Sequence, residues 1–128
     1  MNGIKIVFDT CAAIKLLEEQ YDLALLGINI SEAQFFTSVI VRMELLSKPQ
    51  MQEEEKQRIL GFLDDLTVIS LNEAIEQYAI EIRRTTKLKL PDCIVAATSI
   101  VLDALLLTDD DALLNLSWPG LRTQHIFK

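Results

Sequence analysis

The sequence contains few of the residues that mark fibrous, linker-rich or disulfide-stabilised proteins. Its 128 residues include only four glycines, three prolines and two cysteines. So little glycine and proline excludes a collagen-like or low-complexity chain. Two cysteines cannot form a disulfide framework, which favours a reducing, cytoplasmic setting. Aromatic residues make up 6 % of the chain, so the predicted core is mainly aliphatic.

Long apolar runs are missing as well. The most apolar stretch, 93–107, is interrupted by Thr98, Ser99 and Asp103, whereas a bilayer-spanning helix needs about 20 apolar residues. The N-terminus lacks the basic region and the apolar run of a signal peptide. We therefore expect no membrane association.

Positive charge is scarce relative to negative charge. Nineteen Asp and Glu residues against 12 Lys and Arg residues give a formal net charge of −7. This balance argues against bulk electrostatic binding of nucleic acid. It leaves room for an acidic site that binds a metal ion and, through it, a phosphate group. The chain is 50 % hydrophobic, and its length predicts a single domain over 1–128.

Short apolar runs alternate with segments of helical periodicity. The runs predict strands at 4–8, 34–37, 66–71, 104–107 and 123–127. The other segments predict helices at 11–19, 39–48, 51–65, 73–84 and 92–103, a partly helical segment at 23–28 and a short helix from residue 110. This alternation implies an α/β fold, with a mostly parallel central sheet of four to five strands flanked by helices.

Acidic residues occur where such a sheet places its binding site, beyond the carboxyl ends of the strands. Asp9 follows the first predicted strand, and Asp109–Asp111 follow the fourth. Asp92 begins a helix, and Glu44 lies two turns into the helix after the second strand. Carboxylates about 4 Å apart repel by roughly 4 kcal/mol per pair at an effective dielectric constant of ~20. Such a cluster takes up protons or binds a cation, and oxygen ligands suit Mg²⁺ or Mn²⁺.

Each of these acids also has a structural interpretation. Asp9 and Asp92 fit helix N-caps. The acids at 109–111 suit the positive end of a helix dipole. Glu44, on an otherwise apolar helix, also fits a residue that simply faces solvent. The residues alone leave both interpretations open.

Four segments resemble motifs of a known family. They are Val7–Thr10 (VFDT), Ser38–Leu46 (SVIVRMELL), Leu90–Thr98 (LPDCIVAAT) and Leu106–Asp110 (LLTDD). In order and spacing they look like the PIN-domain ribonucleases, and most like VapC-type toxins of bacterial toxin–antitoxin pairs. The third motif is the most specific of the four, and the resemblance covers nearly the whole chain.

This resemblance implies a three-layer fold and an endoribonuclease that uses Mg²⁺ or Mn²⁺ to activate the attacking water. The implied catalytic and metal-binding residues are Asp9, Glu44, Asp92 and Asp110. Asp111 is the second candidate for the fourth acid, and Thr10 and Thr108 match supporting polar positions. The implied partners are an RNA substrate, a cognate antitoxin and a second copy of the chain in a homodimer.

The sequence departs from the family pattern at two places, neither of which removes an acid. Cys11 stands where the family often has Asn, and Leu113 stands where it often has Phe. Cys11 and Cys93 fit small buried hydrophobes better than a soft-metal or redox site, because no Cys/His ligand spacing is present. The only histidine, His125, is predicted to be structural.

Basic residues gather just before the third motif. Arg83, Arg84, Lys87 and Lys89 could contact RNA phosphates or could balance the dipole at a helix C-terminus. Arg42 could pair with an acid or contact phosphate. These assignments stay open at this stage.

Other functions compete with the nuclease. A PIN-like module that binds protein without catalysis needs only the fold. A Mg²⁺-binding receiver-like signalling domain needs an acidic pair after the first strand and an Asp at the end of the third, where this chain has Ser70-Leu71-Asn72. A haloacid dehalogenase-type phosphatase needs a second Asp two residues after Asp9, where Cys11 stands.

Overall fold

Five parallel strands form one sheet at the centre of the molecule. The structure, a computed structural model, describes residues 3–18 and 23–126. The strands are β1 (Lys5–Phe8), β2 (Gln34–Ser38), β3 (Thr67–Ile69), β4 (Leu105–Thr108) and β5 (Arg122–His125). Their order is β3-β2-β1-β4-β5, and all four pairings are parallel. The α/β prediction is confirmed, and every carboxyl end lies at the same edge of the sheet.

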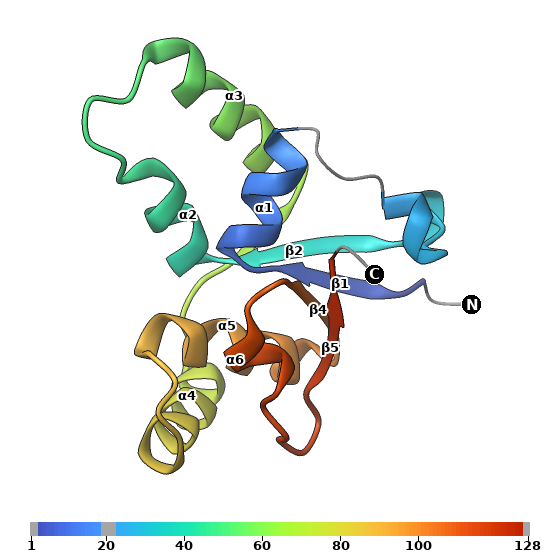
Figure 1. Ribbon diagram of the computed structural model, residues 1–128, viewed down its shortest axis with the longest axis vertical. Coiled ribbons are helices and arrows are strands. Elements are labelled where there is room, and N and C mark those ends of the chain that lie inside the picture. The colour runs from blue at the N-terminus through green and yellow to red at the C-terminus, as the bar shows by residue number, and fades with distance from the viewer. Residues whose placement is uncertain (1–2, 19–22, 127–128) are drawn as a thin grey trace.

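Helices cover both faces of this sheet (Figure 1). The α-helices are α1 (Thr10–Leu17), α2 (Val39–Leu46), α3 (Glu53–Asp64), α4 (Glu73–Thr85), α5 (Leu90–Leu102) and α6 (Asp111–Leu114). Two 3₁₀ turns, η1 (Leu23–Leu26) and η2 (Ile30–Glu32), precede β2. Helices α1 to α3 lie on one side in Figure 1, and α4 to α6 lie on the other. No helix in the described part of the chain is long and apolar enough to cross a membrane.

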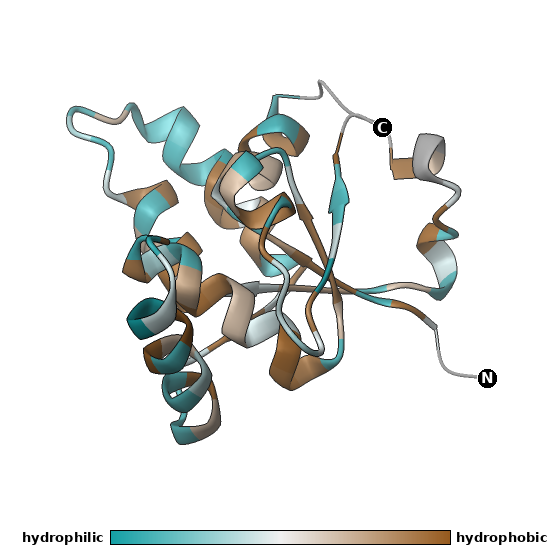
Figure 2. Ribbon diagram, turned by 60° about the horizontal axis from the view of Figure 1, so that its bottom comes forward, coloured by the Kyte–Doolittle hydropathy of each residue, from teal (hydrophilic) through white to brown (hydrophobic). Residues whose placement is uncertain are grey.

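The core divides in two because successive strand residues point to opposite faces. Val7 and Leu106 pack with α4 and α5 on one face. Ile6, Phe8 and Leu107 pack with α1 and η1 on the other. Helix α5 has six buried residues and is a central part of this core. Figure 2 shows the inner strands as hydrophobic, whereas β5, which leads to the C-terminus, is largely hydrophilic.

Side-chain caps fix most of the helix starts. Asp9, Ser38, Asn72 and Asp110 each accept a hydrogen bond from a backbone amide of the helix that follows. These bonds satisfy amides that have no partner within the helix. The cap that the sequence predicts at Asp9 is confirmed.

Several element boundaries differ from prediction. β3 begins at Thr67 because the Leu66 amide still donates a hydrogen bond to the Leu63 carbonyl, in the turn that follows α3. α5 begins at Leu90, so its first turn includes Asp92, which does not cap it. The predicted ends of the first helix at residue 19 and of the last strand at 127 lie outside the described residues.

We expect Thr37→Val to destabilise the protein by about 1–2 kcal/mol. The Thr37 hydroxyl is fully buried and donates to the Phe8 carbonyl across β2 and β1 at 2.7 Å. Valine preserves the shape but removes this donor. Urea unfolding measures the change, with Thr67→Val on the exposed end of β3 as the control. Equal stability of the two variants would contradict the importance of this cross-strand bond.

Candidate active site

A cavity of about 400 Å³ opens at the carboxyl edge of the sheet. Its acidic lining comes from the β1–α1 junction, from α2, from the first turn of α5 and from the loop after β4. The carboxylates in this lining belong to Asp9, Glu44, Asp92, Asp109 and Asp110. The structure thus brings together the four acids expected from the sequence and adds Asp109. We call these five residues the acid cluster.

Asp9 is buried, with only 5 % of its surface exposed. Its Oδ1 accepts a hydrogen bond from the Ala12 amide at 2.8 Å, and the Thr108 hydroxyl donates to its Oδ2. Burial raises the pKa of Asp9, while hydrogen bonds from Cys11, Thr108 and Ala12 oppose the rise. The N-cap interpretation of Asp9 is confirmed, and the same carboxylate also lines the cavity.

The cysteine prediction is correct at one position and wrong at the other. Cys93 is fully buried. Cys11 is half-buried, and its Sγ lies 3.0 and 3.1 Å from the two carboxylate oxygens of Asp9. Burial and the nearby charge of Asp9 raise the pKa of the Cys11 thiol. The thiol therefore stays protonated and acts as a hydrogen-bond donor to Asp9, a role unlike that of a small hydrophobe or a soft-metal ligand.

Thr108 connects Asp9 with the loop after β4. Its side chain is fully buried, and its Oγ1 also accepts a hydrogen bond from the Asp110 amide at 2.9 Å. Asp110 in turn caps α6 through a 2.8 Å bond from the Ala112 amide. Asp111 is exposed and is not part of the cavity lining. Of the two candidates for the fourth acid, Asp110 is the one that the structure places at the cavity.

Glu44 reaches the cavity from α2. It is exposed on α2, as its solvent-facing interpretation requires, yet it lines the cavity. Its Oε1 accepts a hydrogen bond from the Thr10 hydroxyl at 2.6 Å. Because Thr10 begins α1 directly after Asp9, this bond holds α2 and its carboxylate against the centre of the site.

Burial and neighbouring charges change the pKa of Asp92. Burial and then the charges of Asp110, Asp9 and Glu44 raise the pKa of Asp92 to about 6, and the positive charge of Lys89 opposes the rise. Three other members of the acid cluster therefore act on this carboxylate. Negative charge is concentrated here beyond what the protein's own groups neutralise.

Asp109 is the acid that sequence reasoning missed. Its carboxylate pairs with the ammonium of Lys15 on α1 at 2.7 Å, with both side chains largely shielded. Hydrogen bonding to Cys11 and then to Lys15 lowers the pKa of Asp109. The run of three aspartates was visible in the sequence, but only the conformation of the loop decides which of them face the cavity.

The basic residues proposed from the sequence as RNA contacts are not part of the cavity lining. Arg42, Arg83, Arg84, Lys87 and Lys89 are exposed, and none of them lines the acidic cavity. Arg84 forms an ion pair with Glu81 on its own helix. His125 lies in β5, as predicted, and is likewise absent from the lining.

The donor set fits a hard divalent cation. The acid cluster offers carboxylate oxygens, the ligands that Mg²⁺ and Mn²⁺ prefer. Within residues 3–18 and 23–126, no three Asp, Glu, His or Cys side chains already form a group of metal ligands. After burial, the charges of neighbouring carboxylates raise the pKa of Asp92, and a bound cation would offset this repulsion.

Comparison with known proteins identifies the family. The family model of the PIN domain matches residues 6–119. The chain therefore belongs to the PIN-domain family, as the resemblance of its motifs implied. No curated protein matches the chain significantly.

Several solved structures share this fold. VapBC2 from Rickettsia felis, bound to a promoter DNA fragment, matches with a TM-score of 0.80 and 20 % identity over 95 % of this chain and 98 % of that one. VapBC-1 from nontypeable Haemophilus influenzae matches with a TM-score of 0.79 and 19 % identity over 98 % of this chain and 100 % of that one. A toxin–antitoxin complex from Klebsiella pneumoniae matches with a TM-score of 0.69 and 26 % identity over 90 % of this chain and 93 % of that one.

We expect Asp92→Asn to stabilise the metal-free protein by about 1 kcal/mol at pH 7.5, or roughly 3–6 °C in melting temperature. The raised pKa means that ionised Asp92 costs the fold stability above pH 6. This cost fades as the pH falls from about 6 towards the ordinary value of 3.8, because the folded chain then takes up the proton first. Thermal melts in EDTA at pH 7.5 and pH 4 measure both effects.

The same melts, repeated with Mn²⁺, test whether the acid cluster binds a cation. Wild type should gain stability, and Asp92→Asn should lose most of that gain. Asp64→Asn, an exposed carboxylate at the end of α3, should behave like wild type. An Asp92→Asn variant that melts below wild type in EDTA, or keeps the full Mn²⁺ response, would contradict the electrostatic account.

Proposed function

We propose that the protein is a Mg²⁺- or Mn²⁺-dependent endoribonuclease and the toxin of a type II toxin–antitoxin pair. The observation that carries this proposal is the acid cluster, gathered in one cavity at the carboxyl edge of a PIN-domain sheet. Oxygen ligands around an open cavity suit hydrolysis of a phosphodiester by an activated water. In this proposal residues 1–128 act as one nuclease domain.

Asp9, Glu44, Asp92 and Asp110 are the residues proposed to hold the metal ion. When bound, the ion supplies a water of lowered pKa and offsets the charge of the phosphate. Asp9 is held in place by the amide of Ala12 and the hydroxyl of Thr108. Glu44 is held by the hydroxyl of Thr10. These bonds fix the carboxylates in advance, which lowers the cost of ordering them when the site is loaded.

The solved structures with this fold support one of the proposed partners, a cognate antitoxin. The Klebsiella pneumoniae structure is described as a toxin–antitoxin complex, and it shares 26 % identity with this chain. The two VapBC structures share the fold with this chain at lower identity. The other two proposed partners, an RNA substrate and a second copy of the chain, rest on the resemblance of the four motifs to VapC-type toxins.

The strand order speaks against the receiver-like alternative. Receiver-like signalling domains have the order 2-1-3-4-5, whereas this sheet has the order 3-2-1-4-5. The remaining alternative, a PIN-like module that binds protein without catalysis, is separated from the nuclease by the activity test that follows.

We expect purified protein to cut RNA with Mg²⁺ or Mn²⁺ and to lose this activity in EDTA. Total cellular RNA is the appropriate substrate because it includes any selective target. Asp92→Asn should reduce the rate at least about a hundredfold, since it removes one charged ligand from the cluster. Denaturing gels and mapping of the fragment ends measure the cleavage.

Asp64→Asn, purified in the same way, is the control for contaminating nuclease and for altered net charge. Equal cleavage by wild type and Asp92→Asn would contradict the assigned site. Absence of cleavage with either metal, by a protein whose melting temperature responds to Mn²⁺, would favour the silent binding module.

A further inference from the structure

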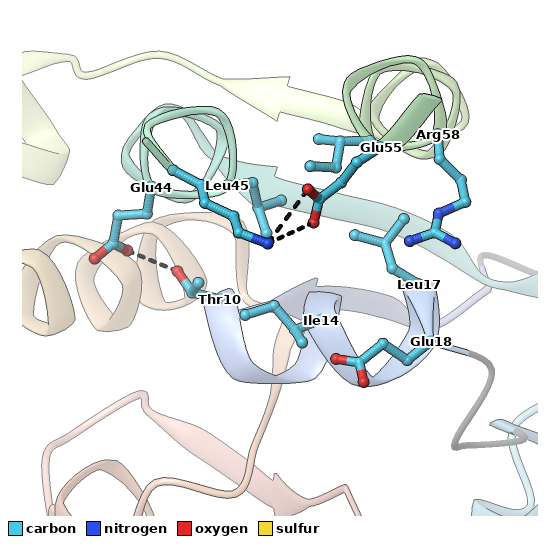
Figure 3. A pocket seen from close by; sticks show the side chains of 10 residues that line it. Thr10, Ile14, Leu17, Glu18, Glu44, Leu45, Glu55 and Arg58 are labelled. Atoms are coloured by element: carbon cyan, nitrogen blue, oxygen red, sulfur yellow. Dashed lines mark hydrogen bonds and ion pairs between the residues drawn. The ribbon is translucent and has the colours of Figure 1, made fainter. Parts of the chain in front are cut away.

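A second cavity adjoins the acid cluster. It has a volume of about 250 Å³ and lies between α1, α2 and α3 (Figure 3). Thr10, Ile14 and Glu44 line both cavities, so the two adjoin one another. A nucleotide attached to a phosphate at the acid cluster would therefore lie beside this second cavity, which we call the side pocket.

The side pocket has both aliphatic and polar walls. Its aliphatic side chains are those of Ile14, Leu17, Leu45 and Ile59. In Figure 3 the Glu44–Thr10 bond lies at one end of α1, and Glu18 and Arg58 lie at the other. Apolar surface combined with polar groups suits a pocket that takes a small ligand and fixes its orientation.

The charges around the side pocket argue against a second phosphate as its occupant. Three carboxylates, of Glu18, Glu44 and Glu55, face two cations, Lys48 and Arg58. The Lys48 ammonium is already bound to both carboxylate oxygens of Glu55, at 3.3 and 3.1 Å. A pocket that offers hydrogen-bond acceptors and donors together suits a neutral, flat group that carries both.

The size of the side pocket favours a single such group. Small-molecule sites usually have volumes of about 300–1,000 Å³, so 250 Å³ takes one nucleobase better than a length of peptide. Arg58 forms no ion pair with another residue in the described part of the chain. Its guanidinium is therefore available to a ligand.

We infer that the side pocket binds the base of the nucleotide next to the cleaved bond, and that this base is an unpaired guanine. Among the four bases, guanine presents two adjacent acceptors, O6 and N7, which match the forked donors of Arg58. Its N1–H and N2–H₂ groups are donors for a carboxylate such as Glu18 or Glu55. The inference rests on the proposed ribonuclease function and adds a sequence preference to it. It also gives an acidic protein a way to select RNA through a base, without a basic surface.

The test is cleavage of a single-stranded RNA of random sequence, followed by sequencing of the fragment ends. For wild type, guanine should be enriched at least about tenfold over adenine at one position flanking the cut. Arg58→Gln should reduce that enrichment to below about threefold, while cleavage itself persists. Lys56→Gln, which removes one positive charge from the same helix α3 but does not line the pocket, should keep the wild-type preference.

A binding measurement keeps this inference separate from catalysis. Fluorescence anisotropy of labelled tetranucleotides on Asp92→Asn protein should show tighter binding of the guanine-containing one, and Arg58→Gln added to that background should abolish the difference. Absence of RNA cleavage by wild type would count against the proposed function. The difference in binding between the tetranucleotides would still show whether the side pocket prefers guanine. Equal binding of all four bases, or a preference that Arg58→Gln leaves intact, overturns the inference. Equal base binding combined with weaker antitoxin binding by Arg58→Gln would assign the pocket to a protein interface instead.

Discussion

The buried carboxylate of Asp9 is the constraint on which the rest of the site depends. It follows the central strand β1 and is almost inaccessible to water. A buried charge is costly unless hydrogen-bond donors surround it. The amide of Ala12, the hydroxyl of Thr108 and the thiol of Cys11 provide those donors. They come from the first turn of α1 and from the end of β4, so the packing of strand and helix and the stability of the charge require one another.

Around Asp9, the protein neutralises only part of its own negative charge. Lys15 pairs with Asp109, and Lys89 acts on Asp92 from the start of α5. Burial, and then the charges of Asp110, Asp9 and Glu44, nevertheless keep the pKa of Asp92 raised. Repulsion between carboxylates lowers the stability of the metal-free protein, and a bound cation would restore that stability. This exchange is the physical reason why folding and metal loading are expected to be coupled here.

Much of this site could be predicted from the sequence because its acids lie at places with local signals. Asp9 directly follows one apolar run and Asp110 comes shortly after another, so any parallel sheet brings them to the same edge. The basic residues could not be placed in the same way. Arg84 turns to Glu81 on its own helix, while Arg58, which lies outside all four motifs, lines the side pocket. A charge on a helix carries no sequence signal for the direction in which its side chain points once the helix has packed.

The sequence by itself determined the alternation of strands and helices and the helix cap at Asp9, and its motifs pointed to Asp9, Glu44 and Asp92, which line the cavity. These features depend on periodicity and on chemistry between near neighbours along the chain. Only the tertiary structure decided the strand order, the entry of Asp109 into the acid cluster, the change of Cys11 from an expected hydrophobe into a donor to Asp9, and the side pocket beside Glu44. Each of these depends on the rotation of one element against another, which is fixed by packing between residues far apart in the chain.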